Sequence, residues 1–170
     1  MKFLLTPLFF ALAFCTAFAN ATDNHGIQPS LTASEHSAVG KALSLSVFKS
    51  PTCGCCQKWI DHIEHSGFRA VAHDTDRLNQ VKTERGILPQ YQSCHTSVSK
   101  DGFVFEGHIP ATIVKRFLDN PPTDAIGLAV PGMPMGSPGM EMGNMRDNYN
   151  VLILRNDGSS DIYEQIIRNR

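Results

Sequence analysis

Three cysteines within four residues, Cys53, Cys55 and Cys56, most constrain the fold of this 170-residue chain. The residues before them, 43–49, alternate apolar and polar side chains and predict a strand. Those after them place apolar residues on one helical face, namely Cys56, Trp59, Ile60 and Ile63. The cysteines therefore lie where a strand meets a helix. The unpaired N–H groups and the dipole at a helix start lower thiol pKa values, which makes cysteines there reactive.

The rest of the pattern predicts an α/β protein. Three further strands are predicted at residues 68–73, 94–98 and 103–106. Two further helices are predicted, one from a cap at Asp74 or Thr75 to Arg85 and one from Pro110 to Leu118. The order β-α-β-α-β-β-α, with a cysteine pair at the first strand–helix junction, is typical of a thioredoxin-like α/β sandwich with a mixed sheet.

Two segments extend this plan toward the C-terminus. Residues 125–148 are rich in Gly, Pro and Met and are predicted to form a long loop. Residues 149–154 and 161–167 are predicted to form an extra C-terminal hairpin around an Asn-Asp-Gly turn.

Residues 1–19 have the layout of a secretory signal peptide. Lys2 supplies a positive charge, and residues 3–18 are mostly apolar. Ala17 and Ala19 are small residues at the positions that a signal peptidase recognises. We therefore expect an exported, periplasmic protein.

The mature chain is expected to be one domain after a short arm. Residues 20–42 are polar and aperiodic, which predicts a flexible arm, and residues 43–170 are the predicted thioredoxin-like metal-binding domain. Removal of residues 1–19 takes one of 15 basic and none of 16 acidic residues, leaving 14 against 16. This near-neutral balance argues against nucleic-acid binding. The sequence contains no second long apolar run, so no membrane span is predicted in the mature chain.

The cysteine spacing leaves several chemistries open. Cys53 and Cys56 are the one comfortable local disulfide pair, and they suit a thiol–disulfide oxidoreductase with Cys53 as nucleophile. A third thiol, Cys55, suits a bridging or chelating site for a soft metal ion better. Cys94 precedes the third strand and is expected to reach the same cluster. Four cysteines also suit a zinc or iron–sulfur module.

The methionines favour copper among these metals. Every methionine except the initiator lies in residues 133–145, within a segment too rich in Gly and Pro for a helix or strand. Thioether sulfur suits Cu(I) and binds zinc poorly. We predict Met133, Met135 and Met140 as ligands ahead of Met142 and Met145. The alternative is a mobile Met-rich docking surface or a lid.

The histidines give weaker indications. His108, at the start of a predicted helix, is a candidate ligand, with a helix-cap or surface role as the alternative. His95 is expected to point away from Cys94, because neighbours in an extended segment alternate in direction. His62 and His65 lie off the apolar face of their helix and are expected to be solvated.

Four motifs together resemble the CopG family of periplasmic copper-resistance proteins. They are SPTCGCC at 50–56, SCHT at 93–96, EGHIPA at 106–111 and the Gly/Pro/Met segment at 127–141. The resemblance runs from about residue 43 to 141. It implies a thioredoxin-like fold that carries a cysteine-bridged, multinuclear copper cluster.

The resemblance also implies a role in the redox handling of periplasmic copper, including conversion between Cu(I) and Cu(II). By motif position, the implied ligands are Cys53, Cys55, Cys56 and Cys94. The methionine segment is an implied contributor, and His108 belongs to a family motif. The implied partners are copper ions and other periplasmic copper-handling proteins. Whether the protein is a copper oxidoreductase stays open.

Overall fold

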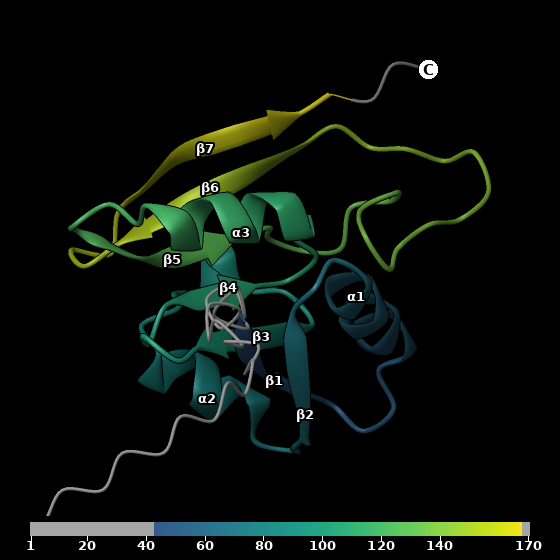
Figure 1. The fold of residues 1–170 in the computed structure, drawn as a ribbon, viewed down its shortest axis with the longest axis horizontal. Coiled ribbons are helices and arrows are strands. Elements are labelled where there is room, and N and C mark those ends of the chain that lie inside the picture. Colours follow the sequence, from purple (N-terminus) through teal and green to yellow (C-terminus); the bar gives the residue numbers. More distant parts are fainter. Residues whose placement is uncertain (1–42, 168–170) are drawn as a thin grey trace, which may run out of the picture. The chain divides into compact units, whose positions relative to one another are not determined.

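The computed structural model describes residues 43–167, which form a mixed seven-stranded sheet and three α-helices (Figure 1). The strands are β1 (Ser44–Lys49), β2 (Arg69–Asp74), β3 (His95–Ser99), β4 (Val104–Glu106), β5 (Ala125–Ala129), β6 (Tyr149–Arg155) and β7 (Ser160–Ile166). The helices are α1 (Gly54–His65), α2 (Leu78–Glu84) and α3 (Ala111–Asp119), with a 3-10 turn η1 (Pro89–Tyr91). None of these helices is long and apolar enough to cross a membrane. The predicted signal peptide and arm lie outside the described residues.

The strand order β2-β1-β3-β4-β5-β6-β7 places β1, which leads into the cysteine turn, between β2 and β3. β1 pairs parallel with β2 and antiparallel with β3, and β3 pairs antiparallel with β4. In the β1–β3 register, Lys49 lies opposite His95. The end of β1 and the start of β3 therefore adjoin. The turn that follows β1 meets the residues that precede β3, although about forty residues separate them in the sequence.

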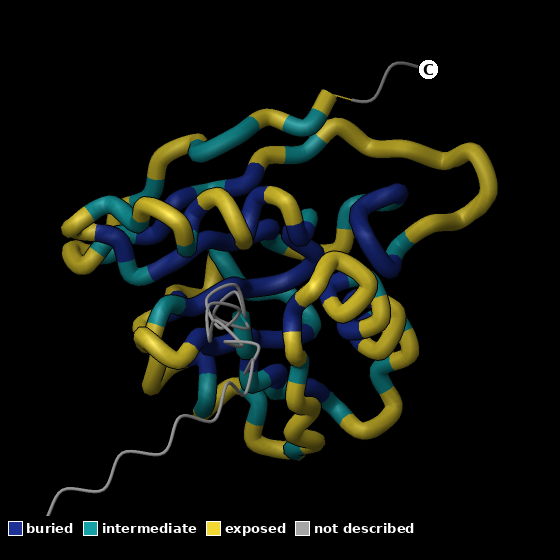
Figure 2. Tube along the Cα trace, in the orientation of Figure 1, coloured by how far each residue is buried: buried dark blue, intermediate teal, exposed yellow. Residues whose placement is uncertain are grey.

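Two apolar clusters cover the two faces of the sheet. The larger joins strands to α1 and α3 and includes Leu45, Val47, Trp59, Phe105 and Phe117. The smaller consists of Ile87, Val98 and Val104, against which Phe48, Tyr91 and Ile126 pack. Alternation along the strands produces this division, since Phe105 faces one cluster and Val104 the other. Figure 2 shows the buried strands and the buried sides of the helices.

The predicted element order is confirmed through α3, as is the C-terminal hairpin, formed by β6 and β7. The prediction of a loop over all of residues 125–148 is wrong, because residues 125–129 form β5 beside β4. Gly127 has a positive φ of 155°, and a Cβ there would collide with the backbone of Val104. The glycine that suggested a loop instead permits a close approach between two strands.

The second helix also begins later than predicted. It starts at Leu78, and its N-cap residue, Arg77, makes no side-chain capping bond. The Thr75 hydroxyl instead accepts a hydrogen bond from the Arg77 N–H at 3.1 Å. Thr75 therefore shapes the turn before α2 and does not cap the helix.

Phe117 on α3 tests how much the larger cluster contributes to stability. Its ring is fully buried and meets Phe103, Phe105 and Tyr163 edge-on, with centroid distances of 5.3, 5.6 and 6.1 Å. Phe117→Ala should lower the free energy of unfolding in urea by about 3–5 kcal/mol. The control Ile162→Ala, at an exposed site on β7, should change it by about 0.5 kcal/mol or less. Equal losses would contradict this assignment of the core.

Candidate metal centre

Helix α1 starts inside the cysteine cluster. Cys53 is its N-cap residue, and the Cys53 sulfur accepts the backbone N–H of Cys56 at 3.3 Å. The Cys53 N–H donates to the Ser50 carbonyl at 3.1 Å, which closes the turn after β1. Cys53 and Cys56 form a disulfide with a Cα–Cα distance of 5.4 Å, whereas Cys55 has a free thiol. The one local disulfide that the spacing comfortably allows is thus formed.

Cys94 joins this turn from the start of β3. Its sulfur lies 3.5 Å from that of Cys56 and 4.0 Å from that of Cys55. The sulfurs of Cys53 and Cys55 are 3.5 Å apart. All four sulfurs lie within 4.8 Å of one another. The structure therefore brings together the four cysteines that the sequence singled out.

His108 reaches the cluster from the turn between β4 and α3. Its Nε2 lies 2.9 Å from the Cys94 sulfur, and its Nδ1 lies 2.7 Å from the Pro138 carbonyl. A carbonyl oxygen can only accept, so Nδ1 carries the proton that it donates to Pro138. In the neutral ring, Nε2 then directs its lone pair at Cys94. His108 is consequently held in the tautomer that a metal ligand requires.

The prediction that His95 points away from Cys94 is wrong. Its Nδ1 lies 3.4 Å from the Cys94 sulfur, and its ring packs on Trp59 and against the edge of His108. Cys94 sits on a bend before β3 begins, so the alternation of an extended strand does not apply between the two residues. The donor atoms of Cys94, His95 and His108 lie within 4.8 Å of one another.

Burial shifts the pKa values of Cys94, His95 and His108. Burial, followed by the neighbouring Cys55, raises the pKa of the Cys94 thiol above its ordinary value, to about 12. Burial also lowers the pKa of His108 and lowers that of His95 well below its ordinary value. Both imidazoles are therefore neutral at neutral pH and can offer a lone pair. Cys94 would release a proton when a metal ion binds.

His62 departs from its predicted solvated position. It is half-buried, and its Nε2 accepts the Ala111 N–H at 3.1 Å. Ala111 is the first residue of α3, and the preceding Pro110 makes no side-chain capping bond. His62 on α1 thus satisfies an N–H group that the helix start leaves open. Only the fold could reveal this long-range cap. His65 is exposed, as predicted.

The methionine segment is only partly packed on the centre. Residues 136–139 are buried, and Gly139 lies so close to α1 that a Cβ would come within 2.8 Å of the Cys55 carbonyl oxygen. Figure 2 shows this buried stretch beside α1, followed by an exposed arc. The methionines divide accordingly: Met135 and Met140 are half-buried, and Met133, Met142 and Met145 are exposed.

Comparisons with known proteins place this centre in a family. Residues 91–140 match a family model described as a protein of unknown function, DUF411. A solved structure of copper resistance protein CopG, form 2, is 38% identical with a TM-score of 0.71, covering 75% of this chain and 100% of its own. The form 1 structure is 39% identical with a TM-score of 0.70, covering 74% and 98%. The chain belongs to the CopG family.

The DUF411 match covers one half of the centre. It contains Cys94, His95 and His108, together with the loop as far as Met140. The disulfide-bearing turn, which follows β1, lies outside these matched residues. A comparison with curated proteins finds no match. The resemblance of this chain to CopG, inferred from four motifs, is confirmed.

The raised pKa of Cys94 predicts its reactivity in metal-free protein. Because iodoacetamide reacts with the thiolate, alkylation of Cys94 should rise about tenfold per pH unit up to about pH 10. Mass spectrometry of the Cys94 peptide measures the rate. In urea-unfolded protein the rate should level off near an ordinary thiol pKa of about 8.5. A plateau at that pH in the folded protein would contradict the assigned burial.

Gly139 tests whether the loop must rest on α1. Gly139→Ala introduces both a positive-φ strain and a clash with the Cys55 carbonyl, whereas Gly132→Ala, at φ 68° with open space around it, introduces only the strain. The control should lose about 1 kcal/mol of stability. Gly139→Ala should lose about 2 kcal/mol more. It should also shift the fluorescence of Trp59, the single tryptophan. Identical behaviour of the two variants would show that the loop is not packed there.

Proposed function

We propose that this protein is a periplasmic copper-binding protein of copper resistance, which holds a cysteine-bridged copper cluster and cycles it between Cu(I) and Cu(II). The observation that carries the proposal is the gathering of four cysteine sulfurs within 4.8 Å of one another, with His95 and His108 in contact with Cys94. The two similar solved structures are both of copper resistance protein CopG. The predicted signal peptide supports the periplasmic location.

The donor set suits copper better than zinc or an iron–sulfur cluster. Cysteine and methionine sulfurs are soft ligands for Cu(I), and imidazole nitrogen binds both copper oxidation states. Cys53, Cys55, Cys56 and Cys94 would supply bridging sulfurs, and His108 a nitrogen already oriented by Pro138. Met140 would contribute from the packed loop, and Met133 and Met135 from the segment before it. Bound copper would supply one-electron redox chemistry.

The fold supports the same proposal. The order β2-β1-β3-β4, with β3 antiparallel to its neighbours, is the arrangement expected of a thioredoxin-like sheet, here extended by β5, β6 and β7. In such a sheet the first helix starts beside the residue that precedes β3. We therefore interpret the domain as thioredoxin-like, with a third thiol in its cysteine turn.

The disulfide must open before all four cysteines can bind metal. A thiol-class reductant would do this in two exchange steps. Two RSH and the Cys53–Cys56 disulfide yield RSSR and two cysteine thiols, with two electrons and two protons transferred. Before reduction, Cys55 and Cys94 are the free thiols of the described residues. Copper capacity therefore depends on the redox state of the turn.

Cys55 distinguishes a metal cluster from a disulfide exchanger. Reduced protein should bind more than one Cu(I) per chain, and Cys55→Ser should lower that number because a bridging sulfur is lost. Elemental analysis after desalting measures the copper content, and Thr52→Ser, an exposed change in the same turn, is the control. Copper binding that is unchanged by Cys55→Ser would overturn the cluster.

A second candidate function rests on the observed disulfide. Cys53 and Cys56 have the spacing and the helix-start position of a thiol–disulfide oxidoreductase, with Cys53 as the attacking thiol. Insulin reduction in metal-free buffer separates the two functions. Vigorous activity that persists in Cys55→Ser would favour the oxidoreductase, because that reaction needs only the Cys53–Cys56 pair.

A further inference from the structure

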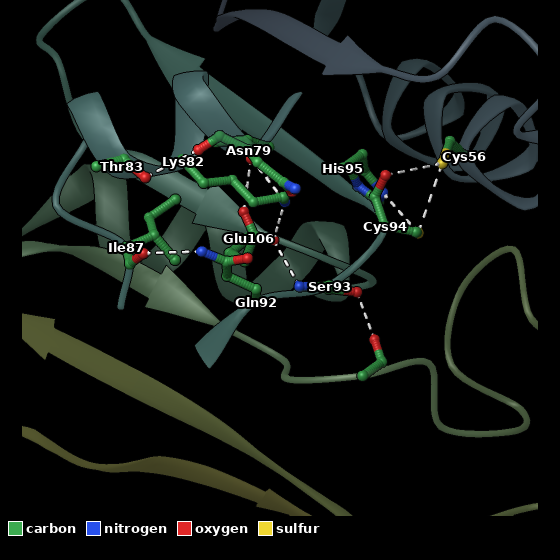
Figure 3. Close-up of polar contacts among 12 residues, drawn as sticks. Cys56, Asn79, Lys82, Thr83, Ile87, Gln92, Ser93, Cys94, His95 and Glu106 are labelled. Atoms are coloured by element: carbon green, nitrogen blue, oxygen red, sulfur yellow. Dashed lines mark hydrogen bonds and ion pairs between the residues drawn. The ribbon is translucent and has the colours of Figure 1, made fainter. Parts of the chain in front are cut away.

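A buried ion pair lies beside the centre, on the opposite face of the sheet from Trp59. Lys82 of α2 and Glu106 of β4 are 2% and 0% exposed and contact each other through Nζ and Oε1. The Thr96 hydroxyl accepts from Lys82 at 3.0 Å and donates to the second Glu106 oxygen at 2.7 Å. Each of these three side chains has hydrogen-bond partners within the group. Figure 3 shows Lys82 and Glu106, and the contact from Glu106 to Ser93, which precedes Cys94.

Stability alone gives little reason for such a pair. Removing two charges from water costs several kcal/mol each, and buried pairs are often replaceable by apolar side chains with no loss. The surroundings here are already apolar, with Ile87, Val98 and Val104 forming the cluster on this face. The position of the carboxylate offers another reason for the pair.

The Glu106 carboxylate also binds the backbone next to Cys94. Its Oε1 accepts the Ser93 N–H at 2.6 Å. Ser93 in turn donates its hydroxyl to the Gly132 carbonyl, at the start of the methionine segment. On the far side of Cys94, the Gly107 N–H donates to the His95 carbonyl at 3.0 Å. Glu106 and its neighbour Gly107 thus hold the chain both before and after Cys94.

We propose that Glu106 is a positioning residue of the metal centre and that Lys82 neutralises its buried charge. Lys82 and Thr96 hold the Glu106 carboxylate, which fixes Ser93 and so keeps the Cys94 sulfur within 3.5–4.0 Å of the sulfurs of Cys56 and Cys55. Cys94 lies one residue outside the β3 ladder, so the β1–β3 pairing brings it to the turn but does not by itself fix the position of its sulfur. The importance of this geometry for copper rests on the proposed function, but the geometry itself can be tested without copper.

Two matched double variants isolate the hydrogen bond to Ser93. Both remove the buried charges. Lys82→Met with Glu106→Gln keeps an acceptor for the Ser93 N–H and gives Thr96 an amide donor. Lys82→Met with Glu106→Leu offers neither the acceptor nor the donor. The two proteins are called the Gln variant and the Leu variant. Equal thermal unfolding midpoints by circular dichroism would show that the two differ only locally. If the Leu variant does not fold, Glu106→Asp alone replaces it, since it keeps the charge and withdraws the carboxylate from Ser93 by one methylene.

Phenylarsine oxide reports the Cys55–Cys94 distance in metal-free protein. One arsenical condenses with two thiols, forming two As–S bonds and releasing one water. In unreduced protein the Cys53–Cys56 disulfide cannot react this way. The fifth cysteine of the chain, Cys15 in the predicted signal peptide, is removed from all proteins by Cys15→Ser. The wild type and the Gln variant should bind one arsenical per chain with equal affinity. The Leu variant should bind about tenfold more weakly, because its two thiols are no longer held together.

Copper titration of the same reduced proteins completes the test. The Gln variant should retain the wild-type Cu(I) number and sulfur-to-copper absorption, and the Leu variant should lose part of both. Equal arsenical affinity in the Gln and Leu variants would overturn the positioning role whatever the copper result. If the arsenical separates them and no protein binds copper, the proposed function fails and the positioning role stands.

Discussion

The antiparallel pairing of β1 with β3 is the constraint on which the rest of the centre depends. It sets Lys49 opposite His95 and so places the turn that carries three cysteines against the bend that carries the fourth. No local propensity could bring these segments together. A one-residue shift of this register would move Cys94 relative to the cysteine turn and reverse the faces of the β3 side chains. The sulfur cluster is therefore a product of sheet topology.

The polar groups in and beside the centre can be buried because apolar packing elsewhere stabilises the fold. Burying His95, His108, Lys82 and Glu106 is unfavourable unless each finds a partner. The apolar cluster between the sheet, α1 and α3 supplies the opposing free energy. His108 has Pro138, and Lys82 has Glu106 and Thr96. The His95 Nε2 has no hydrogen-bond partner among the described residues.

The sequence predicts the features that depend on local spacing and misses those that depend on tertiary contact. The helical face after Cys53 and the expected place of Cys94 follow from periodicity and strand order. β5 was missed because Gly127 is typical of loops, and its role emerges only beside Val104. His95 was misjudged because strand alternation was extended one residue too far. Nothing in the sequence marks Lys82 or Glu106 as buried, since charged residues are usually solvated, although Glu106 begins the EGHIPA motif.

One set of sulfurs serves both the disulfide and the proposed copper cluster, so the two states exclude each other. Cys53 and Cys56 cannot bridge copper while they are bonded to each other. Cys55 and Cys94 stay free in the oxidised form and lie with His108 at the same place. A first ion could bind to these residues without any change in the disulfide. Further copper would require the two electrons that open the pair, which couples the copper capacity of the centre to the thiol chemistry of its turn.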